Sequence, residues 1–114
     1  MSPAESDAFS MLGGIEFRDG RMESRLGRAF KSVRPRLSFA AQLDLMSISE
    51  PRIVLKISID ASGKVTSVDV VRSTGSTLID QPVKVSMYEW WFEPPTTADG
   101  RQRAETFVLP ISWH

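Results

Sequence analysis

The sequence predicts an α+β fold, a small two-layer domain in which a three-stranded antiparallel sheet is packed by one long helix and a short N-terminal helix. Three features predict it: two alternating apolar runs around a glycine turn at residues 52–72, a helix-spaced apolar stripe at residues 79–90, and a strand-like run at residues 107–113. A chain of 114 residues is long enough for one core and too short for two.

The N-terminal third carries the weakest signals. Residues 1–14 are polar and small and are expected to form a disordered lead or the end of a linker. Residues 15–37 are predicted to be an N-terminal arm that packs on the domain. Within this arm, Ile15 to Met22 alternate around Asp19-Gly20, which is a hairpin signal. Because two short strands are marginal alone, this hairpin needs a sheet or core to dock on.

Residues 38–114 are predicted to form the domain itself, beginning with a short helix. Ser38 is its expected cap. The apolar residues that define this helix are Phe39, Ala40, Leu43 and Met46. Between the hairpin and this helix, residues 22–31 are predicted to be a short helix or an ordered arm.

The two central strands are predicted from period-two alternation. In the first strand, one face carries Ile53, Leu55, Ile57 and Ile59. Asp60 to Gly63 supply a turn, because aspartate bonds the backbone ahead of it and glycine takes positive φ without steric cost. The run at residues 64–72 then completes an antiparallel hairpin.

The long helix follows Ser76 and is defined by a buried stripe. The stripe consists of Ile79, Val83, Met87 and Trp90. Asp80 is the predicted N-cap, since a carboxylate accepts a backbone N–H in the first turn and suits the helix dipole there. Pro94 ends the pattern, because the residue before a proline leaves the α region.

A second apolar stripe runs along the same helix at Val85, Tyr88 and Trp91. A helix that is apolar on two sides needs two partners. We expect the arm, around Phe17, Phe30 or Leu37, to cover this stripe. The competing interpretation is a second contact surface for a partner or an oligomer.

Composition excludes several classes of function. The formal net charge is zero, so bulk electrostatics favours neither nucleic acid nor an anionic membrane. A local basic cluster within residues 25–36 is interpreted as a solvated face rather than a phosphate site. Cysteine is absent, so neither disulfides nor thiolate chemistry are available. No run of eighteen apolar residues predicts a membrane span.

Catalytic chemistry has little support in this sequence. The single histidine, His114, cannot assemble a metal cluster or a Cys/His pair in a chain without cysteine. Thr74-Gly75-Ser76 lacks phosphate-loop spacing. We therefore predict no enzymatic activity, no cofactor and no metal.

The pattern of strands, turn, helix and final strand resembles the C-terminal domain of the TonB family of energy transducers. The resemblance covers roughly Pro51 to the C-terminus. It rests on the first strand, Gly63, Val65, the run Val70-Val71-Arg72-Ser73-Thr74-Gly75, Ile79-Asp80, Trp90, Phe92, Pro94 and the last strand.

This resemblance implies a non-catalytic, periplasmic protein-binding domain. Members of the family add an extended segment of an outer-membrane transporter to their last strand and pass on energy from a proton-driven motor of the inner membrane. With the first strand central, the last strand is an expected edge, and Pro110 fits an edge because it cannot donate to a ladder. The implied peptide-binding edge is Thr106, Phe107, Val108, Leu109, Pro110, Ile111 and Ser112.

Several alternatives remain open at this point. The same edge could form a homodimer or be capped by the arm, and docking of Ile15 to Arg21 there would block a peptide. A structural or scaffolding envelope domain, TolA-like or self-associating, would share this layout without a transporter partner. In the family, an N-terminal anchor and a proline-rich spacer link such a domain to the inner membrane, and we expect an excised periplasmic domain.

Overall fold

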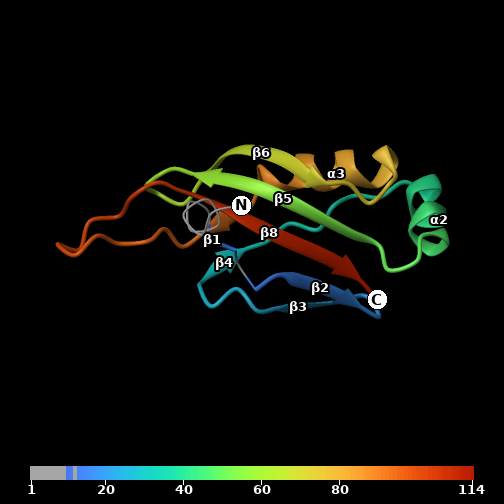
Figure 1. Ribbon diagram of the computed structural model, residues 1–114, viewed down its shortest axis with the longest axis horizontal. Helices are drawn as coiled ribbons and strands as arrows, with labels where there is room; N and C mark the ends of the chain where they lie inside the picture. The colour runs from blue at the N-terminus through green and yellow to red at the C-terminus, as the bar shows by residue number, and fades with distance from the viewer. Residues whose placement is uncertain (1–9, 12) are drawn as a thin grey trace, which may run out of the picture.

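A mixed β-sheet forms one layer of the fold, in a computed structural model that describes residues 10–11 and 13–114. Its strand order is β3-β2-β8-β5-β6, and β1 also pairs with β8 (Figure 1). The elements are β1 Ser10–Met11, β2 Ile15–Arg18, β3 Arg21–Ser24, β4 Phe30–Lys31, α2 Phe39–Ser47, β5 Arg52–Ile59, β6 Val65–Arg72, α3 Thr77–Met87, β7 Trp91–Phe92 and β8 Glu105–Trp113. The α+β class and the central position of β5 between β6 and β8 are as predicted.

The predicted size of the sheet is wrong, because the arm extends it. The hairpin of β2 and β3 adds to the outer side of β8, and β2 and β1 both run parallel to β8. Ile15 and Phe17 lie on the same face of the hairpin, and burying them requires a sheet or core to pack on. The outer side of β8 also offers backbone N–H and C=O groups with which β2 can pair. The expectation that the last strand is an edge is therefore wrong for the described chain: β8 is an interior strand capped by the arm, which was one of the open alternatives, and β3 and β6 end the sheet.

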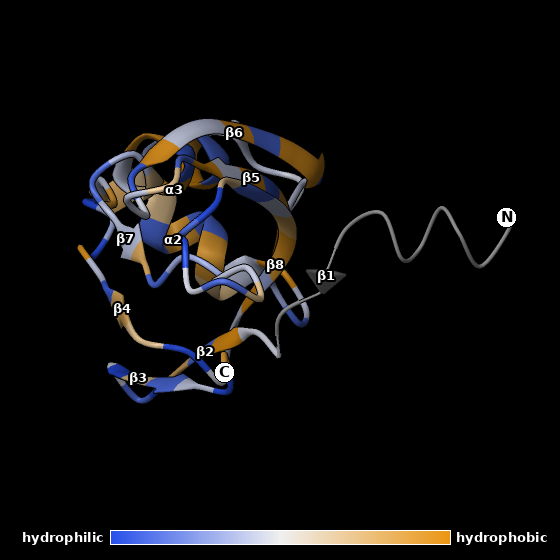
Figure 2. Ribbon diagram, turned by 90° about the vertical axis from the view of Figure 1, so that its left-hand side faces the viewer, coloured by the Kyte–Doolittle hydropathy of each residue, from blue (hydrophilic) through white to orange (hydrophobic). Residues whose placement is uncertain are grey.

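The core lies between the sheet and α3. The predicted alternation of β5 is confirmed, since Ile53, Leu55 and Ile57 are fully buried. The four apolar residues of the predicted helix stripe are all buried, as expected. The predicted end of the helix at Pro94 is wrong, because α3 ends at Met87, Trp90 lies beyond it, and Trp91 and Phe92 form β7. Figure 2 shows the sheet curving around α3, with β7 and β4 on the same side of the sheet as α3. β4 and β7 pair antiparallel as a separate two-stranded sheet.

The start of α3 differs from the prediction. The helix begins at Thr77 after Ser76, so Asp80 lies inside the first turn rather than at the cap. The buried Asp80 carboxylate instead accepts the Thr74 backbone N–H at 3.1 Å, the Thr74 hydroxyl at 2.7 Å and the Ser73 hydroxyl. Asp80 therefore organises the loop that precedes the helix.

Helix α2 forms where expected, with the Ser38 hydroxyl accepting the Ala41 N–H at 3.1 Å, but its buried face is not the predicted one. Ala41 is completely buried, whereas Phe39, Leu43 and Met46 are 75%, 48% and 83% exposed. A small residue at the contact lets α2 approach the domain closely. Leu45 is half-buried against the core, whereas the other large apolar side chains named above face solvent. None of the described helices is long and apolar enough to cross a membrane.

Candidate functional site

Strand β8 divides the predicted peptide-binding residues between two faces. Phe107, Leu109 and Ile111 point into the core and are at most 2% exposed. The alternate residues, among them Pro110, lie on the opposite face and are half-buried. Four of the seven predicted side chains are therefore partly accessible and three are buried, so recognition along this strand depends on its backbone.

The backbone N–H groups of β8 alternate between its two neighbours. The Trp113 N–H donates to the Pro51 carbonyl on the β5 side at 3.1 Å, and the His114 N–H donates to the Phe17 carbonyl on the β2 side at 2.7 Å. Even-numbered residues of β8 consequently direct their N–H groups toward the outer side. The nitrogen of Pro110 faces that side too, so the ladder with β5 loses no donor.

The outer side of β8 is already paired with the chain's own N-terminal segment. Met11 lies opposite Val108, and Ile15 lies opposite Ile111, both in parallel register. Met11 and Ile15 are four residues apart, whereas their partners Val108 and Ile111 are three apart, so the register shifts by one residue between the two pairs. The shift falls beside Pro110, where an outward N–H is missing.

Two glycines make this passage sterically feasible. Gly14 has φ +95°, and a Cβ there would lie 3.1 Å from both Cγ and the carbonyl oxygen of Pro110. At Gly13, a Cβ would lie only 2.0 Å from the Arg25 carbonyl oxygen. The Arg25 N–H donates to the Gly14 carbonyl at 3.1 Å. The expectation of a disordered lead or linker end at residues 1–14 lies mostly outside the described residues, and its last two residues, Gly13 and Gly14, belong to this passage.

The arm is anchored at three further places. Phe17 stacks on Trp113 with ring centroids 5.8 Å apart. Phe30 stacks on Trp90 at 5.9 Å, and the Trp90 indole N–H donates to the Val33 carbonyl at 2.9 Å. Aromatic stacking of this kind adds to simple apolar burial.

The third anchor is an ion pair between the arm and the first residue of β8. Arg28 Nη1 lies 2.6 Å from Glu105 Oε1, and the two side chains are only 17% and 10% exposed. The guanidinium also lies 5.4 Å from the centroid of the Phe107 ring. Arg28 therefore belongs to the packing of the domain, not to a solvated basic face.

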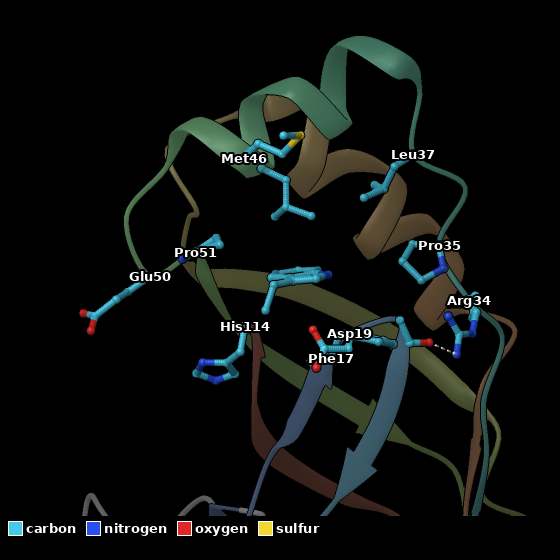
Figure 3. Close-up of a pocket in the computed structure, with 12 residues that line it drawn as sticks. Phe17, Asp19, Arg34, Pro35, Leu37, Met46, Glu50, Pro51 and His114 are labelled. Atoms are coloured by element: carbon cyan, nitrogen blue, oxygen red, sulfur yellow. Dashed lines mark hydrogen bonds between the residues drawn. The ribbon is translucent and has the colours of Figure 1, made fainter.

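A pocket of about 660 Å³ opens at the C-terminal end of β8, between the hairpin and α2 (Figure 3). Trp113, Leu45 and Met46 line it from the domain. Phe17 and Leu37 line it from the arm. At its rim, Arg34 Nη2 donates to the Gly20 carbonyl at 2.7 Å.

The predicted second contact surface on α3 and the segment after it is not continuous. Trp91 lies in β7, where Lys31 of β4 is opposite it and its indole N–H donates to the Ser62 carbonyl at 2.7 Å. The arm leaves the other two residues uncovered, since Val85 is 64% and Tyr88 44% exposed. The arm therefore reaches this stripe only at Trp91, and it does so through Lys31 rather than through the expected Phe17, Phe30 or Leu37.

Tyr88 has a role that the sequence pattern did not indicate. Its hydroxyl accepts the Val68 N–H of β6 at 3.2 Å. β6 is one end of the sheet, and an unpaired donor on an end strand invites association with another chain. Tyr88 therefore provides an intramolecular acceptor for one backbone N–H on that edge.

The geometry around His114 does not form a catalytic triad. Its Nε2 lies 3.2 Å from the Ser112 hydroxyl and 3.9 Å from a carboxylate oxygen of Glu16. A triad needs the hydroxyl and the carboxylate on different ring nitrogens, whereas here both face the same one. Among residues 10–11 and 13–114, no group of three acidic, histidine or cysteine side chains could hold a metal ion.

Comparison with known proteins identifies the domain. Residues 49–114 match the family described as the Gram-negative bacterial TonB protein C-terminal. The solution NMR structure of the TonB C-terminal domain of Pseudomonas aeruginosa aligns with a TM-score of 0.51 and 21% identity, over 75% of this chain and 85% of that chain. No curated protein matches the chain significantly. The structural likeness supports the fold, and the family match begins at residue 49, after the arm and α2.

Proposed function

The chain belongs to the family of TonB C-terminal domains, and we propose that it is a non-catalytic module of an energy transducer that pairs β8 with an extended peptide of an outer-membrane transporter. The observation that carries this proposal is the pairing of β8 with β1 and β2. A strand that accepts a parallel neighbour along its outer side is competent for strand addition. The same module would act in the periplasm, coupled through an N-terminal anchor to a proton-driven motor of the inner membrane.

Strand β8 is a better candidate for this pairing than β6. The Val68 N–H of β6 is already engaged by the Tyr88 hydroxyl. On β8, Val108 and Ser112 direct their N–H groups outward, and the fully buried Phe107, Leu109 and Ile111 fix the strand rigidly in the core. A peptide added there would pull on the strand that is hydrogen-bonded to central β5 over its whole length. Such an attachment suits a module that transmits force.

The test is a titration of the isotopically labelled full chain with synthetic peptides that carry the N-terminal sequences of outer-membrane transporters. Backbone pairing predicts amide shift changes concentrated at residues 105–113, largest at Val108 and Ser112. The matched control is the same peptide with N-methylated backbone at alternate residues, which removes ladder donors and should abolish the shifts. Shift changes confined to the exposed face of α2, or equal binding of the methylated peptide, would contradict strand addition.

A second candidate function is a structural envelope domain that associates with itself or with a constant partner. The exposed stripe of Phe39, Leu43 and Met46 on α2 favours it, since large apolar side chains grouped on one helix face often mark contact sites. Sedimentation of the wild-type chain and of Met46→Ser distinguishes the two functions. A dimer that the substitution dissociates would support self-association, and a monomer at all concentrations would exclude it.

A further inference from the structure

The outer edge of β8 is occupied along nearly its whole length by β1 and β2, which together are called the cis strand. The cis strand starts opposite Phe107 and ends opposite Trp113. The His114 N–H, which points outward, is bonded to Phe17 of this strand. A peptide added in the manner proposed above needs the same row of backbone groups. Both strands cannot occupy it together.

We propose that the cis strand is an intramolecular competitor that keeps the peptide-binding edge of β8 closed until a partner displaces it. This inference rests on the proposed function and adds its regulation. Because the cis strand is tethered to the domain, its effective concentration at β8 is in the millimolar range. A partner peptide must therefore bind more strongly than backbone pairing alone provides, or bind a state in which the arm has opened.

The structure of the arm fits a segment that can leave as a unit. β2 and β3 are joined by their own ladder, so the two strands would leave β8 together. Besides its ladder to β8, the arm is held by the buried side chains of Ile15 and Leu26, by the Phe17–Trp113 and Phe30–Trp90 stacks, and by the Arg28–Glu105 pair. Opening breaks these contacts but leaves α3 packed on the sheet formed by β5 and β6, so it costs less free energy than global unfolding of the domain.

A reversible covalent lock tests the proposal. The chain has no cysteine, so E16C/S112C introduces a single pair, at positions that lie opposite each other in β2 and β8. Neighbouring strands lie about 4.8 Å apart, within the range of a disulfide. The oxidised variant should bind the transporter peptide at least tenfold more weakly than the same protein after reduction.

The matched control is E16C/E23C, which joins β2 to β3 across the hairpin and leaves β8 untouched. Its affinity for the peptide should be the same when oxidised and when reduced. If the oxidised E16C/S112C variant binds as tightly as its reduced form, the cis strand does not compete and the inference is overturned.

Release of the arm by substitution gives the opposite effect. Gly14→Val places a branched side chain against Pro110 at a positive φ, and should raise peptide affinity several-fold. Gly27→Val is the control, because Gly27 also has a positive φ, +69°, but a Cβ there meets nothing within 4 Å. Equal affinities of the two variants would contradict the proposal.

Hydrogen exchange tests the opening without any peptide. If the arm opens as a unit, the outward amides of Val108, Ser112 and His114 exchange at least tenfold faster than the amides of Leu109 and Ile111, which face β5. Equal protection of the two sets overturns the inference. If the two sets of amides differ in protection but no variant binds any peptide, the arm opens as inferred and the proposed function is contradicted.

Discussion

Removing the charge of Arg28 should destabilise the protein far more than removing a surface charge. Arg28→Met keeps an apolar stem over the Phe107 ring but leaves the Glu105 carboxylate, only 10% exposed, without its partner 2.6 Å away. A charge-assisted hydrogen bond contributes roughly 1.5–3 kcal/mol, and leaving one buried charge unpaired adds to that loss. We expect a loss of about 3 kcal/mol in the free energy of unfolding, or roughly 12 °C in Tm for a chain of this size.

The assay is a double-mutant cycle with Glu105→Gln, followed by urea denaturation and tryptophan fluorescence. The coupling energy between the two residues should be about 1–2 kcal/mol and should persist in 1 M salt, because buried pairs are screened little. The control cycle is Arg18→Met with Glu16→Gln, a pair 3.8 Å apart with side chains 53% and 31% exposed. Its coupling should stay below about 0.5 kcal/mol. Equal coupling in the two cycles would refute the reasoning.

Two further predictions concern the turn between β5 and β6. Gly63→Ala should lower the free energy of unfolding by about 3–4 kcal/mol, because φ is +94° and a Cβ there would lie 2.2 Å from the Phe92 carbonyl oxygen. The control Gly100→Ala, at φ +85° with nothing within 4 Å of its Cβ, should lower it by only about 1 kcal/mol. Equal losses of Tm in the two variants would show that the close contact is unimportant. The Ser62 hydroxyl, then the Lys64 N–H, hold the pKa of Asp60 below its ordinary 3.8. The stabilisation from Asp60 is therefore present at pH values above its ordinary pKa of 3.8 and disappears as pH falls through the lowered pKa. An NMR titration should show that pKa rising toward 3.8 in Ser62→Ala.

The strands of the domain could be predicted because their signal is local. Ile53, Leu55 and Ile57 alternate with more polar residues, and burial on one face requires that alternation whatever the neighbours are. The stripe of α3 is equally self-contained. These elements also carry the family resemblance, so fold class and family followed from one stretch of sequence.

The remaining features depend on partners distant in the chain. No residue near Ile15 identifies Ile111 as its pairing partner. Parallel strands are not connected by a short turn, so the local sequence carries no signal for their pairing. On α2, Ala41 gives a weaker apolar signal than Phe39 or Met46, yet close packing favours the small residue. Thus the number of strands and the buried face of a short helix were mispredicted, while the identity of β8 as the proposed binding strand came from family resemblance.

The pocket beside Trp113 has walls from two parts of the molecule that would separate when the arm opens. Phe17 and Leu37 belong to the arm, and Leu45 and Met46 belong to the domain. A small apolar molecule that filled this space would contact both walls only in the closed form. Because linkage is reciprocal, the molecule would lower the affinity for the peptide by the same factor by which the peptide lowers the affinity for the molecule. On the proposal above, the pocket would be an allosteric control point, and a molecule bound there would inhibit peptide binding by holding the arm closed against β8.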